Sequence, residues 1–358
     1  MSKIRTNVLL NICIVIGLLL LFYYAFLTHD TINQRNLKKN ARKDIKHVKF
    51  LPPSLKKRRE YNVWLIFTKV TKISTLSFKF RDLIHNLLNV TSVPLKFNII
   101  VDKISQRIAE NQISDVVLYM NKSVVYSFYD IEESAKKIQD IVQVMTPYFS
   151  SKPGTYYSDA LFYISLGLYR IAPQSQDIAV LLDCDLYFKK DVALLFKEFD
   201  KFKSTALFGL APELTPVYRH ILHMYKAKHN TTFGDYYHQQ NISNATHPRG
   251  FQGYNSGVVL IRLKAQRNST EFLKVINNSS VLEMTSKYKF RGHLGDQDFY
   301  TLLGYEYPHL IQTLNCGFNR QLCTWWRDHG YSDIFDHYAK CDHDTVVLHG
   351  NCNTRIPK

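Results

Sequence analysis

Residues 178–185 read IAVLLDCD, and this segment decides the fold class of the chain. Its five apolar residues predict a buried strand, and Asp183 and Asp185 follow at the carboxyl end of that strand. In open α/β sheets, ligands bind beyond the carboxyl ends of the strands. Two carboxylates one residue apart suit a divalent cation, which can in turn hold a diphosphate. The alternative is a strand that ends in aspartates of a plain turn, where this residue type is common.

Strand and helix patterns alternate on both sides of this segment. Runs rich in apolar and β-branched residues predict strands at 61–70, 94–102, 205–211 and 256–263. Periodic apolar patterns predict helices at 76–88, 132–145, 159–171 and 191–199. This alternation favours an α/β domain with a Rossmann-like, mixed and mainly parallel sheet that is flanked by helices.

The composition of the 358 residues, 46% hydrophobic and 21% charged, is that of a globular protein and excludes a disordered or fibrous chain. The formal net charge of +16 is uneven, because residues 1–60 carry +10 and residues 61–358 carry +6. Since no basic stripe runs through the larger part, the sequence argues against a nucleic-acid partner.

The N-terminal region contains a membrane signal. Residues 8–27, VLLNICIVIGLLLLFYYAFL, hold no charge and are long enough to cross a bilayer as a helix. We interpret them as an uncleaved signal anchor between a cytoplasmic tail (1–7) and a basic stem (28–60), which leads to a folded domain (61–358). The alternative is a cleaved signal peptide, whose apolar region is usually shorter and is followed by an Ala-x-Ala type site. No such site follows Leu27.

Evidence on the compartment of the folded domain conflicts. The basic residues that follow the apolar segment favour a cytoplasmic domain. Eight Asn-x-Ser/Thr sequons favour the secretory lumen, at Asn89, Asn121, Asn230, Asn241, Asn244, Asn268, Asn277 and Asn278. Four clustered cysteines suggest two disulfides and an oxidising compartment, and they are Cys316, Cys323, Cys341 and Cys352. A zinc site is the alternative, although Cys-x2-Cys pairs are lacking. We place the domain in the lumen and leave the charge conflict open.

Three further motifs carry candidate site residues. In FQGYNSGVVL (251–260), small and amide residues precede a strand and permit close approach of a ligand, although a plain turn explains them equally well. In RGHLGDQD (291–298), Asp296 is the predicted N-cap of a helix. His349 can supply a third metal ligand and would favour Mn²⁺ over Mg²⁺, although a single histidine is more often structural. The pair Trp325–Trp326 offers flat faces for a sugar, with core packing as the alternative.

In this order, the motifs resemble the retaining glycosyltransferases of family 8, which have the GT-A fold. NRQLCTWWRDHGYSDIF (319–335), HGNCNTRIP (349–357) and RGHLGDQDF (291–299) resemble the xylosyltransferases within that family. The resemblance covers most of residues 61–358, whereas 228–249 looks like an insertion specific to this chain. It implies transfer of xylose from UDP-xylose, in retaining α-1,3 linkage, to the xylose of xylosyl-glucose on EGF-like repeats of Notch-type receptors.

The resemblance also implies roles for individual residues. It assigns Mn²⁺, with Mg²⁺ as the alternative, to Asp183, Asp185 and His349. It assigns the donor to Phe67, Thr68, Lys69, Cys184, Asn255, Ser256, Gly257, Gly295, Asp296 and Gln297, and the acceptor to Tyr218, Trp326 and Asn351. It implies the disulfides Cys316–Cys341 and Cys323–Cys352. Many family members have a lysine shortly after the final histidine motif, where this chain has Asn351 and Asn353, so the cation at the phosphate must come from elsewhere.

The mechanism that follows needs no protein nucleophile. Retention usually implies a carboxylate nucleophile, but the resemblance places Gln297, a poor nucleophile, nearest the reacting sugar carbon. We therefore expect UDP to leave and the acceptor hydroxyl to enter on the same face, and the departing phosphate oxygen to take the acceptor's proton. Asp183, Asp185 and Gln297 are the predicted catalytic residues.

Two other functions are consistent with the same sequence. One is a family-8 transferase that uses UDP-glucose or UDP-galactose, and the other is a non-catalytic, glycan-binding protein of the lumen. The predicted location is the endoplasmic reticulum membrane, as a single-pass type II protein, with the Golgi as the alternative. The sequence makes no prediction of the oligomeric state.

Overall fold

The computed structural model describes residues 60–150, 160–237 and 250–357. The predicted tail, the signal anchor and all of the predicted stem except Glu60 lie outside these ranges, as do Asn241 and Asn244. Among the described helices, none is both long enough and apolar enough to cross a bilayer.

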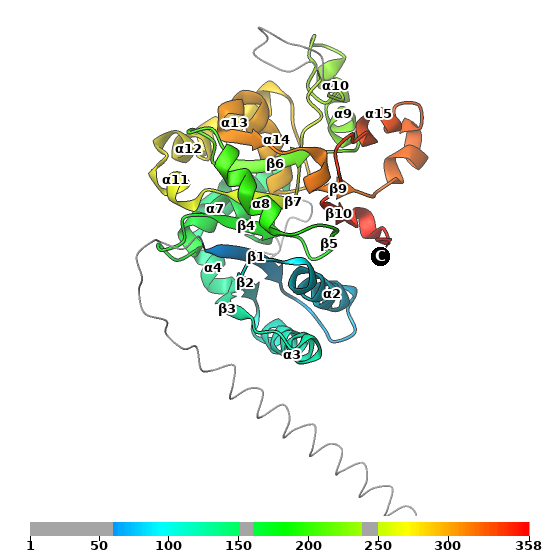
Figure 1. Ribbon diagram of the computed structural model, residues 1–358. Helices are drawn as coiled ribbons and strands as arrows, with labels where there is room; N and C mark the ends of the chain where they lie inside the picture. The colour runs from blue at the N-terminus through cyan, green and yellow to red at the C-terminus, as the bar shows by residue number, and fades with distance from the viewer. Residues whose placement is uncertain (1–59, 151–159, 238–249, 358) are drawn as a thin grey trace, which may run out of the picture. The chain divides into compact units, whose positions relative to one another are not determined.

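A seven-stranded sheet forms the centre of the described domain (Figure 1). Its order is β3-β2-β1-β4-β7-β6-β8. The strands are β1 (Tyr61–Phe67), β2 (Leu95–Val101), β3 (Val125–Asp130), β4 (Ala179–Leu182), β6 (Phe208–Pro212), β7 (Tyr254–Ile261) and β8 (Ile311–Thr313). Neighbouring strands are parallel except where β7 pairs with β4 and β6. The prediction of a mixed, mainly parallel sheet flanked by helices is confirmed.

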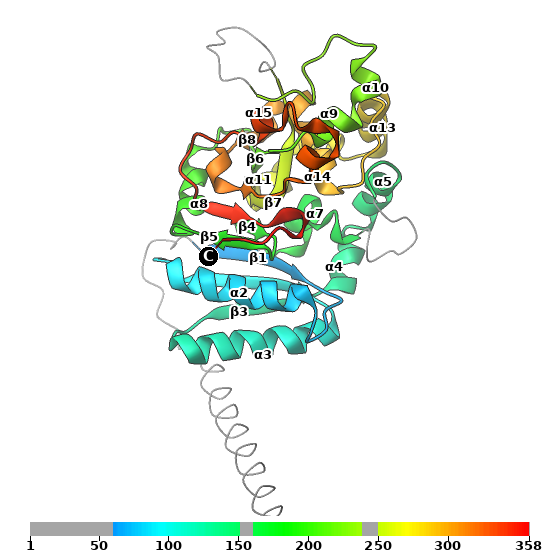
Figure 2. The ribbon, with the colours of Figure 1, turned by 90° about the vertical axis from the view of Figure 1, so that its right-hand side faces the viewer.

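Helices cover both faces of this sheet because alternate side chains of β1 are buried on opposite sides. Val63 and Leu65 of β1 join one apolar cluster with α2 (Thr75–Val90) and α3 (Lys103–Met120), which lie side by side in Figure 2. Trp64 joins a second cluster with α4 (Ile131–Lys137), α5 (Gln139–Phe149) and α7 (Ile164–Ile171). Burial on both faces explains why β1 reads as a continuous apolar run.

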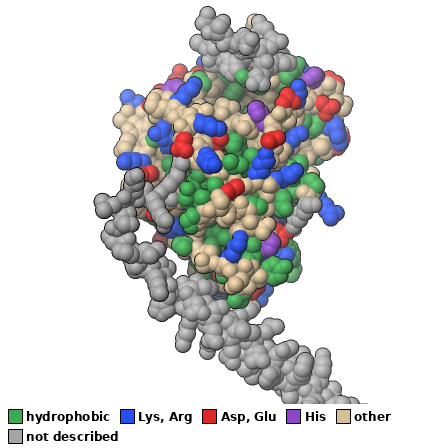
Figure 3. All heavy atoms as spheres, in the orientation of Figure 1, with side chains coloured by type: hydrophobic (Ala, Val, Ile, Leu, Met, Phe, Trp, Pro, Cys, Tyr) green, Lys and Arg blue, Asp and Glu red, His purple; other side chains and the backbone are tan. Residues whose placement is uncertain are grey.

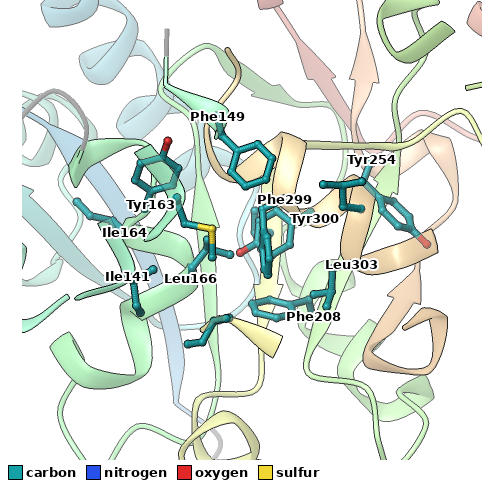
Figure 4. Close-up of a cluster of buried hydrophobic side chains, with 14 of the residues drawn as sticks. Ile141, Phe149, Tyr163, Ile164, Leu166, Phe208, Tyr254, Phe299, Tyr300 and Leu303 are labelled. Atoms are coloured by element: carbon teal, nitrogen blue, oxygen red, sulfur yellow. The ribbon is translucent and has the colours of Figure 1, made fainter. Parts of the chain in front are cut away.

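The remaining helices belong to the second half of the chain. They are α8 (Ala193–Glu198), α9 (Val217–Ile221), α10 (His223–Lys226), α11 (Leu263–Asn268), α12 (Thr270–Val275), α13 (Asn278–Lys287), α14 (Asp296–Glu306) and α15 (Phe335–Ala339). Helix α14 is fixed by aromatic packing (Figure 4). The Tyr300 ring lies edge-on to Phe208 at 4.9 Å between centroids, and the Phe299 ring meets Phe149 at 6.2 Å. These contacts hold the amino end of α14 at one position beside the sheet.

The reversed direction of β7 brings two distant sequence motifs together. Leu182, the last residue of β4, pairs with Val258 near the start of β7, and the Asp183 backbone N–H donates to the Gly257 carbonyl oxygen at 3.0 Å. Because β7 is antiparallel to β4, its amino end lies at the carboxyl end of β4. The strand begins at Tyr254, so Asn255, Ser256 and Gly257 lie within β7 and not before it as predicted, and this amino end of β7 faces the aspartates that follow β4.

A second, three-stranded sheet holds the C-terminal segment beside the first. Its order is β5 (Leu186–Phe188), β10 (Val347–His349) and β9 (Arg320–Gln321). The disulfides Cys316–Cys341 and Cys323–Cys352 join the β9 region to the C-terminal segment. These are the two pairs that the resemblance implies, and the alternative of a zinc site at these cysteines is wrong because their sulfurs bond to one another.

The surface charge of the domain is mixed. Figure 3 shows acidic and basic side chains interspersed on one face, with apolar side chains between them. A nucleic-acid-binding surface gathers its basic side chains into a patch or stripe.

Candidate active site

The side chains of Asp183, Asp185 and His349 converge at the carboxyl end of β4. The His349 Nε2 atom lies 3.7 Å from Asp183 Oδ2 and 3.4 Å from Asp185 Oδ1. One ligand atom from each residue lies within 4.8 Å of the other two. Strand β4 delivers the aspartates, and β5, which begins directly after Asp185, pairs with β10 so that Leu186 lies opposite His349. The Gly350 N–H also donates to the Asp185 carbonyl oxygen at 2.8 Å.

The three groups perturb one another's protonation. Partial burial opposes ionisation of Asp185, but the hydrogen bond and charge of His349, together with Lys79, lower its pKa to about 2. Burial also opposes a charged His349, yet Asp185 and Asp183 raise the pKa of this imidazole. The pKa of Asp183 is raised because protein atoms surround it and Asp185 repels its charge. With 58% of the Asp183 side chain exposed, solvent weakens both effects.

This donor set fits a divalent cation. It offers two carboxylates and one imidazole, whose nitrogen and oxygens are ligands for Mn²⁺ and similar ions. A cation at this point takes over the charge balance that protons otherwise provide, since metal ligands bind in their deprotonated forms. The described residues therefore agree with the expectation of a site for a divalent cation.

Lys79 of α2 brings a cation to the edge of this site. Its Nζ atom lies 3.3 Å from Asp185 Oδ2 and 3.1 Å from Asn353 Oδ1. A cavity of about 920 Å³ opens beside these groups. Its lining comprises Lys79, Asp82, Cys184, Asp185, Leu186, Tyr187, Asn353, Thr354, Arg355, Ile356 and Pro357. The sequence analysis missed Lys79, because a lysine on an amphipathic helix carries no signal of its own.

The motif at the start of β7 serves the metal ligands rather than an open surface. A Cβ atom at Gly257 would lie 2.3 Å from Cε1 of the His349 ring, so only glycine leaves room for the imidazole. The Asn255 side chain is 5% exposed and turns inward. The Ser256 backbone N–H donates to Gln297 Oε1 at 3.2 Å and links β7 to α14.

Helix α14 begins one residue earlier than the sequence predicts. Its N-cap is Gly295, whose φ of 65° favours glycine, and the prediction of Asp296 as the N-cap is wrong. The Asp296 carboxylate instead accepts a hydrogen bond from the Ser165 hydroxyl. Asp298 is fully buried and accepts from the Leu294 N–H at 2.8 Å. Burial raises the pKa of both Asp296 and Asp298 to about 7.

The first two of the residues that the resemblance assigns to the donor at the end of β1 have buried side chains. The Phe67 ring packs inside the core against Phe80, with 4.2 Å between centroids. Thr68 is buried, and Lys69 has a φ of 55° while its N–H donates to the Asp102 carboxylate. The Cys184 thiol is buried and points to the Ile66 carbonyl oxygen. The side chains of Phe67 and Cys184 are therefore packed inside the domain.

The three residues that the resemblance assigns to the acceptor differ in accessibility. Tyr218 is completely buried and its hydroxyl donates to Asp298 Oδ1 at 3.0 Å, so it does not face an acceptor in this structure. Trp326 is half-buried against Tyr331. Asn351 is partly exposed, but its Oδ1 atom accepts from two backbone N–H groups, those of Leu322 and Cys323. Trp325, which precedes Trp326 in the sequence, is the exposed member of the tryptophan pair, with 48% of its surface accessible.

A mainly parallel sheet whose central strand ends at paired aspartates, with a distant histidine completing the cluster, defines a GT-A glycosyltransferase. The comparisons make the family specific. Over 308 residues the chain is 37% identical to human "Xyloside xylosyltransferase 1". This alignment covers 84% of this chain and 75% of the human protein. The mouse protein of that name is also 37% identical, over 307 residues. The chain belongs to the xyloside xylosyltransferase family, which confirms the prediction of an enzyme of the xylosyltransferase class.

Solved structures support the same fold. The crystal structure of the mouse enzyme in its apo form matches with a TM-score of 0.76 and covers 83% of this chain and 100% of that chain. The bifunctional glycosyltransferase WbbM, 13% identical, matches with a TM-score of 0.53 and so shares the fold alone. A search of protein-family models gave no match.

Proposed function

We propose that this chain transfers xylose from UDP-xylose, in α-1,3 linkage and with retention, to the xylose of a xylosyl-glucose acceptor on EGF-like repeats. The observation that carries the proposal is the convergence of Asp183, Asp185 and His349 beside a large cavity, in a member of the xyloside xylosyltransferase family. The family supports the donor sugar and the xyloside acceptor. The EGF-like carrier rests on the sequence motifs around Trp326 and His349.

Asp183, Asp185 and His349 would hold Mn²⁺. When bound, the ion would neutralise charge that develops on the departing diphosphate. Lys79 provides a further positive charge within 3.3 Å of Asp185, and Arg355 lines the same cavity. We assign Lys79 to the diphosphate, as the cation that replaces the family's C-terminal lysine.

Gln297 is held in a fixed orientation rather than free to attack. Its Oε1 atom accepts from the Ser256 N–H at 3.2 Å, and its Nε2 atom donates to Glu213 at 3.2 Å. An amide is a weak nucleophile, and both ends of this one are occupied. This supports displacement on one face of the sugar, in which the acceptor hydroxyl gives its proton to the departing phosphate oxygen. Gly295, Asp296 and Gln297 would line the sugar, because they stand at the amino end of α14 opposite Ser256.

The acceptor would lie along the exposed tryptophan. Trp325 stacks on His329 with 3.8 Å between ring centroids, and Trp326 lies edge-on beside it at 4.9 Å. Stacked aromatic faces accommodate the C–H surface of a sugar while the indole N–H can donate. The partly exposed Asn351 stands on the same C-terminal segment as His349.

We further propose that the catalytic domain lies in the lumen of the endoplasmic reticulum, with the Golgi as the alternative, and is anchored through residues 8–27. Accessible sequons support this location. All six sequon asparagines within the described residues are exposed, namely Asn89, Asn121, Asn230, Asn268, Asn277 and Asn278. Glycosylation of these sites in cells, detected as a mass loss on treatment with peptide N-glycosidase, would support the lumenal orientation, and an unmodified chain would contradict it.

A UDP-sugar screen tests the function directly. The folded domain is incubated with UDP-xylose, UDP-glucose or UDP-galactose and a synthetic xylosyl-glucosyl EGF repeat, with Mn²⁺ or with chelator. We expect xylose transfer that requires the cation and is abolished by Asp185→Asn. Asp344→Asn is the matched control, because that carboxylate is 89% exposed and pairs with Lys190 at the surface. Transfer of a different sugar would reassign the donor, and glycan binding without UDP release would make the protein non-catalytic.

A further inference from the structure

A network of hydrogen-bonded, buried polar side chains connects His349 with Gln297. Its members are Asn319, Asn255 and Glu213, whose exposed fractions are 0%, 5% and 3%. They come from three separate parts of the chain: the residue before β9, the start of β7, and the residue after β6. Buried polar groups are costly unless they are paired, so the direction of each hydrogen bond carries information.

The contacts of Asn255 show which atoms of the network donate and which accept. The Gly257 backbone N–H, which can only donate, lies 3.0 Å from Asn255 Oδ1. This contact identifies the amide oxygen and turns the Asn255 Nδ2 group toward Glu213, whose Oε2 atom accepts at 2.9 Å. The assignment of oxygen and nitrogen in this amide therefore rests on a backbone donor at one end and a carboxylate acceptor at the other.

The same reasoning extends to His349. Asn319 contacts the Asn255 Oδ1 atom at 2.8 Å, and since that oxygen only accepts, the Asn319 group must be its Nδ2. The remaining Asn319 Oδ1 atom faces His349 Nδ1 at 3.0 Å and can only accept. His349 must therefore carry its proton on Nδ1. Its Nε2 lone pair then points to Asp183 and Asp185, as a metal-ligating imidazole requires.

At the other end, Glu213 orients the amide of Gln297. The carboxylate accepts from Thr215 Oγ1 at 2.7 Å and from Gln297 Nε2 at 3.2 Å, in addition to Asn255. The backbone around Glu213 is held on both sides, because its N–H donates to the Gly253 carbonyl oxygen at 2.9 Å and the Leu214 N–H donates to Gln321 Oε1 at 2.7 Å. A carboxylate fixed in this way leaves Gln297 one orientation, with its oxygen toward Ser256.

We propose that Asn319, Asn255 and Glu213 are positioning residues that select the metal-binding tautomer of His349 and the amide orientation of Gln297. The proposal rests on the proposed roles of His349 and Gln297. It makes Asn255 a part of the support beneath the site rather than a direct contact of the donor sugar. It also adds Asn319 and Glu213, which the sequence analysis did not single out.

The tautomer can be measured in the wild-type domain without any variant of the network. In metal-free protein with ¹⁵N-labelled histidine, at a pH where His349 is neutral, the ring resonances of His349 are assigned by their loss in His349→Gln. We expect a protonated Nδ1 and an unprotonated Nε2. A proton on Nε2 would overturn the proposal, whatever the variants show.

Mn²⁺ binding to the metal-free domain, measured by titration calorimetry without donor, tests the role of Asn319. Loss of an outer hydrogen-bond partner of a metal ligand typically weakens affinity about 10- to 100-fold. We expect a loss of about that size for Asn319→Leu, and partial recovery for Asn319→Asp, whose carboxylate can still accept from Nδ1. Asn98→Leu is the control, because Asn98 is as buried as Asn319 but bonds to Asn62 and Gln176, away from the site. Wild-type affinity in Asn319→Leu would refute the role.

Glu213→Leu tests the other end. The amides of Asn255 and Gln297 both donate to Glu213 Oε2, and a leucine offers neither of them an acceptor, so both lose the partner that orients them. We expect kcat at saturating donor and Mn²⁺ to fall about tenfold or more, since misplacing an active-site group by about 1 Å can cost that much. An unchanged kcat removes Glu213 from the proposal. If the wild-type domain binds Mn²⁺ no better than Asp185→Asn does, the proposed function is wrong. The tautomer measurement needs no metal, so it still tests whether the network selects the tautomer of His349.

Discussion

Substitution of Gly257 by alanine gives the sharpest test of how the metal site is built. The added Cβ atom would lie 2.3 Å from Cε1, 2.6 Å from Nδ1 and 3.0 Å from Nε2 of His349. An ordinary contact begins at 3.4 Å, so the ring must move by at least about 1.1 Å. The backbone of Gly257 has no positive φ, so alanine is opposed by the imidazole rather than by strain.

The expected effects are separable. Displacement of the ring by this distance breaks its alignment with Asp183 and Asp185, and we expect Mn²⁺ affinity to fall about 10- to 100-fold, as for other losses of ligand orientation. Overpacking should also lower the free energy of unfolding by about 1–3 kcal/mol. Titration calorimetry of the metal-free domain measures the first effect and urea denaturation the second.

Gly209→Ala provides the matched control. Gly209 lies in β6, and its Cβ would meet the Phe202 ring at 2.6 Å, away from the metal ligands. We expect a similar loss of stability with wild-type Mn²⁺ affinity. If Gly257→Ala binds Mn²⁺ as tightly as Gly209→Ala does, the argument that glycine makes room for His349 is wrong.

Three further predictions concern other parts of the domain. Lys79→Met should raise the Kd for UDP about tenfold, because a charge-assisted hydrogen bond contributes about 1.5–3 kcal/mol; Lys190→Met is the control, and equal effects in calorimetry would remove Lys79 from the donor site. Burial raises the pKa of Asp298 to about 7 from an unfolded value near 3.9, so its contribution to stability is complete below about pH 4 and is lost as the pH rises through 7. Denaturation of the chelator-treated domain should therefore show stability falling between about pH 4 and 7, with a smaller fall in Asp298→Asn; an identical slope would count against the buried acid. Phe149→Ala should cost about 3–5 kcal/mol in urea denaturation, because its ring packs on Phe299 in the core, and a loss under 1 kcal/mol would contradict that packing.

The elements that sequence patterns predict best are those buried on both faces. The predicted strands at 61–70 and 94–102 contain β1 and β2, and the helix at 76–88 lies within α2. Strand β3 was missed because it is short and lies at the edge of the sheet, none of its side chains is fully buried, and Ser127 interrupts its apolar residues. Helix α3 was missed as well: only five of its 18 residues are buried, and the Asp102 cap that starts it is a weak signal alone.

The residues of the candidate site also differ in how far the sequence alone could predict them. The aspartates after β4 are readable because they end an apolar strand, whereas His349 gains meaning only from the pairing of β10 with β5. Lys79 and Glu213 have no local signal, since their importance comes from what the fold places beside them. For Tyr218, which the resemblance assigns to the acceptor, the fold buries the side chain completely, and nothing in the neighbouring sequence indicates that burial.

The order of the ligands along the chain affects biosynthesis. A ribosome finishes every strand of the seven-stranded sheet once it has passed Thr313, but the imidazole enters only with residue 349. A translation product that stops between these two points contains all strands of the large sheet and both aspartates, yet lacks His349 and the Cys323–Cys352 disulfide. With His349 as the proposed third ligand, the nascent chain is expected to be inactive until β10 has been made, and premature stop codons in this interval should yield inactive proteins however well the large sheet assembles.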